Sequence, residues 1–192
     1  MHMMTSYPGG TELDDVPLHV IHLDQDDPRK CTSRKLASRG LCFLHSDIRN
    51  APKRGILLDP LSGKLIGPDD EISINRGSSI VGLDCSWKEI EPSVDLLHKN
   101  TNLDCRTLPI VLASNPISWG KPGRLSTSEA FAASLYILGR KEQARNVLSS
   151  FPYADQFFKL NMEPLEAYHD AETNAELSDM QWEFFDRPIS EP

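Results

Sequence analysis

Two apolar runs are the clearest strand signals in the chain. Residues 79–84 read Ser-Ile-Val-Gly-Leu-Asp and residues 108–113 read Leu-Pro-Ile-Val-Leu-Ala, which is typical of parallel strands covered on both faces. Between them, residues 87–99 place apolar side chains, among them Val94 and Leu97, at helical spacing. Strand, helix and strand in this order predict an α/β unit with a right-handed crossover.

Shorter elements are predicted on the N-terminal side of these runs. Residues 19–23 and 55–58 have the composition of short strands. The segment 27–36, which begins Asp-Pro, predicts a turn that leads into a helix ending near Gly40.

After Arg124 the pattern becomes helical. Ser126 and Glu129 satisfy the S-x-x-E capping box, in which the hydroxyl and the carboxylate each bind an otherwise unpaired backbone N–H. Apolar residues follow, and Gly139 is the expected stop. Further helices are predicted at residues 141–149, 155–160 and 163–173.

These elements predict an α/β fold made of an α/β N-terminal part and a helical C-terminal part. The expected divisions are a flexible tail at residues 1–15, an α/β domain at 16–115, a mostly helical domain at 116–186 and a second tail at 187–192.

The formal net charge of −8 speaks against a nucleic-acid partner, because binding to phosphates normally requires a surplus of Lys and Arg. The basic residues are clustered, however, between positions 28 and 57: Arg29, Lys30, Arg34, Lys35, Arg39, Arg49, Lys53 and Arg54, against the single acid Asp47. Two interpretations stay open, a nucleic-acid-binding face or an ordinary solvated surface.

Four cysteines, at positions 31, 42, 85 and 105, show no C-x-x-C pairing and are expected to be free thiols. No metal site is expected from spacing alone, although a cluster assembled in three dimensions, such as Cys31 with His45, stays open. No apolar run approaches the roughly 18 residues of a membrane helix, and the first ten residues lack a signal-peptide pattern, so a cytoplasmic location without membrane contact is expected.

Two loops could carry chemistry, because ligands of open α/β sheets bind beyond the carboxyl ends of the strands. In the first, Asp84 ends a strand and Trp87 follows; the carboxylate could accept hydrogen bonds from an ammonium, and the indole could shield a flat or cationic ligand. In the second, residues 113–127 lead into a helix N-terminus, which attracts anions. Purely structural roles stay open for both: a Trp that caps the core, and a long connector with a capped helix.

Familiar nucleotide signatures are missing. The chain contains no G-x-G-x-x-G after a strand and no G-x-x-x-x-G-K-[ST], so neither a Rossmann methyltransferase nor a P-loop enzyme is indicated. A G-x-S-x-G nucleophile elbow is absent as well.

Four blocks in order, at residues 27–36, 82–87, 106–116 and 120–130, closely resemble one family. The family is that of the small-subunit ribosomal RNA aminocarboxypropyltransferases, which act in ribosome biogenesis. The resemblance covers roughly residues 18–170.

The resemblance implies a SPOUT-like fold with a deep C-terminal trefoil knot that forms a pocket for S-adenosyl-L-methionine. It also implies transfer of the 3-amino-3-carboxypropyl group to N3 of a pseudouridine or N1-methylpseudouridine in the small-subunit RNA, with release of 5′-methylthioadenosine. Members of the family are thought to act as monomers. Two rival interpretations are a SPOUT-like RNA methyltransferase and a non-catalytic assembly factor that binds pre-ribosomal RNA.

Carried over residue by residue, the resemblance implies a cofactor site. Thr32 and Thr127 contact the amino acid part of the cofactor, the Leu83 backbone holds the ribose, and backbone groups of Leu108 and Gly123 read the adenine. The remaining implied residues are the apolar walls and neighbours Leu58, Pro60, Trp87, Leu125 and Ser126. This sequence departs from the family at Gly123, where an aromatic residue is frequent, and at Trp119, where Tyr is frequent.

Asp84 is the nearest candidate for a general base that removes the N3 proton, with binding of the cofactor's ammonium as the alternative. The basic segment supplies the expected RNA-binding residues, which are Arg29, Lys30, Arg34, Lys35, Lys53 and Arg54.

Overall fold

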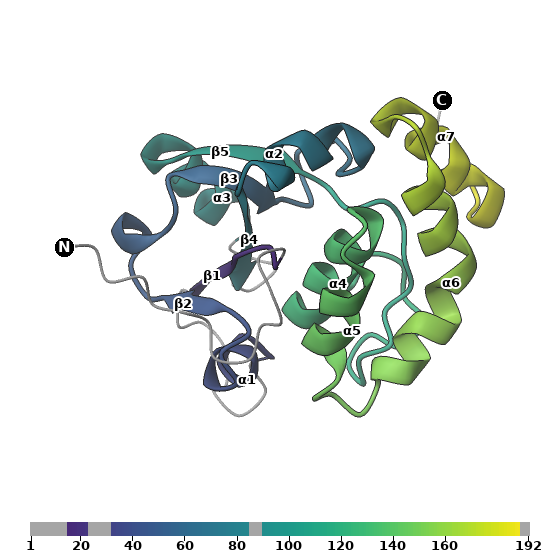
Figure 1. Cartoon of the computed structure of the whole chain (residues 1–192), viewed down its shortest axis with the longest axis horizontal. Helices are drawn as coiled ribbons and strands as arrows, with labels where there is room; N and C mark the ends of the chain where they lie inside the picture. The colour runs from purple at the N-terminus through teal and green to yellow at the C-terminus, as the bar shows by residue number, and fades with distance from the viewer. Residues whose placement is uncertain (1–14, 23–31, 85–89, 189–192) are drawn as a thin grey trace.

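A parallel sheet forms the centre of the molecule. The computed structural model describes residues 15–22, 32–84 and 90–188, and within them five strands pair in the order β2-β1-β4-β3-β5 (Figure 1). The strands are β1 (Leu18–His22), β2 (Phe43–His45), β3 (Arg54–Leu58), β4 (Ser79–Asp84) and β5 (Asn102–Arg106). The helices are α1 (Thr32–Ser38), η1 (Ile48–Asn50), η2 (Pro68–Asp70), α2 (Glu71–Asn75), α3 (Ile90–Asn100), α4 (Thr127–Ile137), α5 (Lys141–Leu148), α6 (Ala154–Asp170) and α7 (Asn174–Phe184).

Successive residues of the central strands enter different cores, because strand side chains alternate between the two faces of a sheet. Ile80 of β4 belongs to the larger hydrophobic cluster, which also contains Phe131 of α4. Its neighbour Val81 belongs to a second cluster with Leu97 of α3. The sheet is therefore covered on both faces, as the apolar run at residues 79–84 predicts.

Helix α4 is buried around its whole circumference, with Ser128, Glu129 and residues 131–137 all shielded from solvent. It packs against β4 on one side and against α5 and α6 on the other, and in Figure 1 the helices α4 to α7 stand beside the sheet. Side chains from both parts of the chain, from Val16 to Leu177, contribute to one hydrophobic cluster.

Gly82 allows α4 to approach β4 closely. A Cβ atom at this position would lie 3.1 Å from Cζ of Phe131 and 3.3 Å from Cγ2 of Thr127. The absence of a side chain here therefore sets the distance between the strand and the first turn of the helix.

The prediction of a strand at residues 108–113 is wrong. The fifth strand of the sheet is instead β5, at residues 102–106. Pro109 has no N–H to donate to a ladder. The chain leaves the sheet and runs along α6, where the side chain of Asn161 accepts from the Leu112 N–H at 2.7 Å and donates to the Leu112 carbonyl at 2.9 Å. A helix side chain thus replaces the neighbouring strand as the hydrogen-bond partner.

The C-terminal helices also differ from the prediction. Residues 155–160 and 163–173, predicted as separate helices, are mostly joined in α6, which contains Pro164. Helix α7 was not predicted, although it carries a readable start signal: the Thr173 side chain accepts a hydrogen bond from the Glu176 N–H. No helix in the described ranges has both the length and the apolar character needed to cross a membrane.

Candidate functional site

Two helix N-termini meet the carboxyl end of β4 on one face of the sheet. Thr32 begins α1, Thr127 begins α4 and Asp84 ends β4. Thr127 lies against Gly82, and the residue after Thr32 bonds to Asp84. The structure therefore brings together Thr32, Asp84 and Thr127, which the sequence analysis assigned to one site although they come from distant segments.

Asp84 is held by side chains of two other elements. Ser33 Oγ donates to Asp84 Oδ2 at 2.6 Å, and His22 Nδ1 lies 3.1 Å from the same oxygen. The Arg34 guanidinium lies 3.3 Å from His22 Nε2. Because a guanidinium can only donate, Nε2 of a neutral His22 accepts, and Nδ1 carries the proton and donates to Asp84.

The cluster formed by Asp84, Ser33, His22 and Arg34 is partly buried, and Asp84 keeps some contact with solvent. The side chain of His22 is 3% exposed and that of Asp84 is 14% exposed. Two contacts on Oδ2 orient the carboxylate, so Asp84 is placed to accept a proton or to bind a cation. The sequence analysis missed Ser33 and His22; the available signal for His22 is that β1, like β4, ends in a polar residue.

The N-terminus of α4 and the preceding loop form one hydrogen-bonded unit around Glu129, whose residue is fully buried. Its carboxylate accepts six hydrogen bonds, two each from Ser114, Asn115 and Ser126, at 2.7–2.9 Å. The predicted capping box at Ser126 is confirmed. Glu129 also ties the loop after residue 113 to the helix, a role that local sequence does not indicate.

Three leucines implied as pocket neighbours, Leu58, Leu108 and Leu125, are partly buried and pack against the larger hydrophobic cluster. Gly123 adopts the left-handed φ of +67°, which favours glycine. Its N–H donates to the Val111 carbonyl at 3.0 Å. Pro60 is exposed just beyond β3, and Trp87 lies outside the described residues.

The four implied RNA-binding residues that the structure describes, Arg34, Lys35, Lys53 and Arg54, come from two separate segments. Arg34 and Lys35 belong to α1, and Lys35 Nζ lies 4.7 Å from the ring centroid of Phe151. Arg54 opens β3, directly after Lys53, and therefore lies at the amino edge of the parallel sheet, opposite Asp84. Arg29 and Lys30 lie outside the described residues.

A histidine pair occupies β1 and β2. His19 Nδ1 lies 2.9 Å from His45 Nε2, and the His19 ring also stacks on Phe43. Burial, with a further contribution from His45, lowers the pKa of His19 from 6.5 to about 4. His19 contacts His45 of β2, whereas His22, three residues further along β1, contacts Asp84 of β4. Cys31, the other member of the cluster that stayed open with His45, lies outside the described residues.

Residues 56–185 match the family described as Ribosome biogenesis protein, C-terminal. Residues 16–45 match a second description, Possible Fer4-like domain in RNase L inhibitor, RLI. That segment contains only two cysteines, Cys31 and Cys42, whereas an iron–sulfur cluster of the ferredoxin type needs four. The residues present therefore do not fit such a cluster. The match that covers most of the sheet and the helices places the chain in the class of ribosome biogenesis proteins.

Two relatives identify a particular family within this class. The chain is 44% identical over 171 residues to the 16S rRNA aminocarboxypropyltransferase of Methanosarcina mazei, covering 89% of this chain and 96% of the relative. It is 39% identical over 168 residues to the protein of the same name from Methanocaldococcus jannaschii, covering 87% and 95% of the two chains. The chain belongs to the 16S rRNA aminocarboxypropyltransferase family.

The fold has a solved counterpart. The structure of the SAM-dependent rRNA:acp-transferase Tsr3 from Vulcanisaeta distributa is similar with a TM-score of 0.76 and 35% sequence identity, and the match covers 88% of each chain.

Proposed function

We propose that this protein transfers the 3-amino-3-carboxypropyl group of S-adenosyl-L-methionine to N3 of a pseudouridine or N1-methylpseudouridine in small-subunit ribosomal RNA. The observation that carries this proposal is the meeting of Thr32, Asp84 and Thr127 at one edge of the sheet, in a chain that belongs to this family. The released product is 5′-methylthioadenosine.

The cofactor site includes the two helix N-termini. Their free N–H groups and positive dipole ends suit the carboxylate of the cofactor's amino acid part, which Thr32 and Thr127 contact, with Ser126 adjoining. The Leu83 backbone holds the ribose, and Leu108 and Gly123 offer backbone groups to the adenine. Leu58, Pro60, Trp87 and Leu125 supply the apolar surroundings.

The reaction forms a bond between N3 and the carboxypropyl carbon next to sulfur. That carbon–sulfur bond breaks, its electron pair stays on sulfur, and the positively charged sulfonium becomes a neutral thioether. The N3 proton goes to a base, for which Asp84 is the candidate. Because three carbons of a sulfonium are electrophilic, the carbon held at near-attack distance from N3 selects the group that is transferred.

The finer features of the fold belong to the same proposal. A SPOUT-like deep trefoil knot in the C-terminal region, residues 116–186, completes the pocket, and the α/β part, residues 16–115, provides the RNA-binding residues. Their support is the family resemblance and the likeness to Tsr3. A monomeric, cytoplasmic protein is proposed from the sequence expectation, and most of the two predicted tails, residues 1–15 and 187–192, lies outside the described residues.

Labelled cofactor tests the transferred group. Ribosomal RNA from a strain that lacks the protein is incubated with cofactor labelled either in the carboxypropyl chain or in the methyl group. Label is expected to enter the RNA only from the carboxypropyl carbons, together with release of 5′-methylthioadenosine. Methyl label in the RNA with release of S-adenosylhomocysteine would instead establish a methyltransferase.

Calorimetry tests the remaining alternative, a non-catalytic assembly factor that binds pre-ribosomal RNA. An enzyme of this kind binds S-adenosyl-L-methionine in the absence of RNA, whereas a pure assembly factor has no reason to bind it. Absence of cofactor binding by the folded full-length protein would therefore refute the proposed function.

A further inference from the structure

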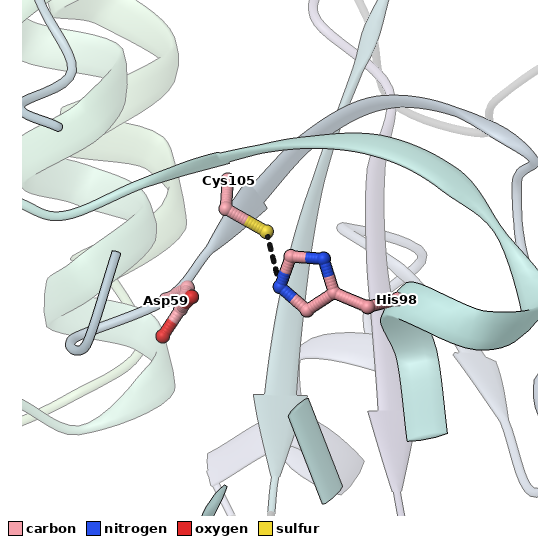
Figure 2. Close-up of side chains that lie close together, drawn as sticks. All are labelled: Asp59, His98 and Cys105. Atoms are coloured by element: carbon pink, nitrogen blue, oxygen red, sulfur yellow. Dashed lines mark hydrogen bonds between the residues drawn. The ribbon is translucent and has the colours of Figure 1, made fainter. Parts of the chain in front are cut away.

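A second cluster of reactive side chains lies on the other face of the sheet, in a cavity of about 550 Å³. Asp59 follows β3 directly, His98 belongs to the last turn of α3 and Cys105 belongs to β5. Figure 2 shows the three side chains converging from these separate elements. None of them belongs to the cofactor site described above.

The geometry suits one ion bound by all three residues. Their ligand atoms all lie within 4.8 Å of one another, and Cys105 Sγ lies 3.3 Å from His98 Nε2. Sulfur and nitrogen ligands of a tetrahedral zinc ion stand about 3.5 Å apart, given bond lengths of about 2.3 and 2.0 Å. The thiol and the imidazole therefore already have the separation of two ligands of one ion.

The surroundings favour a cation. Asp59 is only 3% exposed, and its Oδ1 accepts the Leu61 N–H at 2.8 Å, which orients the carboxylate as outer-shell hydrogen bonds orient metal ligands. Among the other charged residues that line the cavity, acids outnumber bases: Glu91, Asp95 and Asp104 against Lys64 and Arg106. Arg106 is already paired with Asp70 at 2.9 Å.

A Cys–His–Asp nucleophile is the alternative use of these residue types, and the structure does not favour it. In such a triad the carboxylate orients the histidine, but within the described ranges no hydrogen bond joins Asp59 to His98.

We propose that Asp59, His98 and Cys105 bind a divalent transition ion of the zinc class, with its fourth coordination position open to the cavity. Thiolate, imidazole and carboxylate are all ligands that zinc accepts. The bound ion joins α3 to the carboxyl ends of β3 and β5, and the Cys105 thiol releases its proton when it binds.

Cobalt titration of the chelator-treated full-length protein tests this site, because cobalt replaces zinc and thiolate coordination produces a charge-transfer absorption band. One equivalent of cobalt is expected to produce the band, and zinc is expected to remove it by competition. Cys105→Ser is expected to abolish the band, and His98→Gln to weaken cobalt binding at least tenfold. Cys42→Ser is the matched control and keeps the band, because Cys42 is buried in the other hydrophobic cluster.

His98→Gln keeps the test decisive if Cys105→Ser fails to fold, because His98 is exposed and its replacement leaves the core intact. A folded wild-type protein without the band would overturn the proposal. So would a band that persists in Cys105→Ser or unchanged affinity in His98→Gln. Binding of S-adenosyl-L-methionine is measured in parallel, which separates failure of this proposal from failure of the proposed function, because His98 and Cys105 do not belong to the proposed cofactor site.

Discussion

Asp84 shows how one side chain depends on its supports. Ser33 Oγ and His22 Nδ1 both contact Oδ2 of Asp84, so the carboxylate is held in one orientation at the end of β4. A base that is oriented before substrate arrives needs little rearrangement during the reaction.

Asp84→Asn is expected to lower turnover at saturating cofactor by about 10²–10⁴-fold, the usual contribution of a general base, with less than a tenfold loss of cofactor affinity. Single-turnover assays and calorimetry measure the two quantities separately. Ser33→Ala is the control, because it removes one support and keeps the carboxylate. Lost cofactor binding with normal turnover at saturation would assign Asp84 to the cofactor's ammonium instead.

His19 makes stability depend on pH. Its pKa falls from 6.5 to about 4 on folding, through burial and then through His45, so protonation favours the unfolded chain. The contribution of His19 to stability is complete above pH 6.5 and is lost as the pH falls towards about 4. Urea unfolding at pH 7 and pH 5 is expected to show a smaller loss of stability in His19→Asn than in the wild type. Equal losses in the two proteins would show that His19 does not cause the dependence.

One buried acid, Glu129, holds the first turn of α4 in position. Glu129 accepts hydrogen bonds from Ser114 and Asn115 of the loop and from Ser126 at the helix cap. Since Ser126, Thr127 and Gly123 all belong to the proposed cofactor site, stability and cofactor binding are coupled through this helix end.

Glu129→Gln places an amide N–H₂ among N–H and O–H donors and removes the negative charge. The free energy of unfolding is expected to fall by about 2–4 kcal/mol, and cofactor affinity is expected to fall with it. Glu176→Gln is the matched control, because the Glu176 carboxylate also accepts a backbone N–H at the start of a helix, that of Glu172 at 2.7 Å, but Glu176 is exposed; its cost is expected to stay below about 1 kcal/mol. Denaturant unfolding of both variants gives the comparison, and equal costs would contradict the role assigned to Glu129.

Over the whole molecule, the implied RNA-binding residues within the described ranges lie near two edges of the sheet. Lys35 belongs to α1, next to the proposed cofactor site, and Lys53 and Arg54 lie at the amino edge, where β3 begins. Under the proposed function, RNA that presents a base to the cofactor site passes the first edge, so the two groups are expected to contribute unequally to RNA binding.

Charge reversal separates the two edges. Lys35→Glu is expected to weaken RNA binding and to reduce the slope of log affinity against log salt by about 0.7, the value for one phosphate contact of a single strand. The double variant Lys53→Glu with Arg54→Glu is expected to have the smaller effect, and cofactor affinity stays unchanged in both. Filter binding at several salt concentrations measures the slopes, and a larger effect at Lys53 and Arg54 would move the RNA to the amino edge.

Local sequence was sufficient for β4, for the capping box of α4 and for the family to which the chain belongs. A strand that is buried on both faces and a helix cap are specified within a few residues, because apolar runs and side-chain caps act on neighbouring backbone groups. The four blocks identify the family from sequence alone because each lies within a short, continuous segment.

The partners of Asp84 and Glu129, the path of residues 108–113 and the cluster of Asp59, His98 and Cys105 required the fold. His22 and Asp84 are 62 positions apart and meet only because β1 and β4 pair side by side. Residues 108–113 have the composition of a strand, but their backbone groups find partners such as Asn161 on a helix 49 positions away. Composition indicates that a segment is buried, whereas the order of strands and the packing of helices select the groups that surround it.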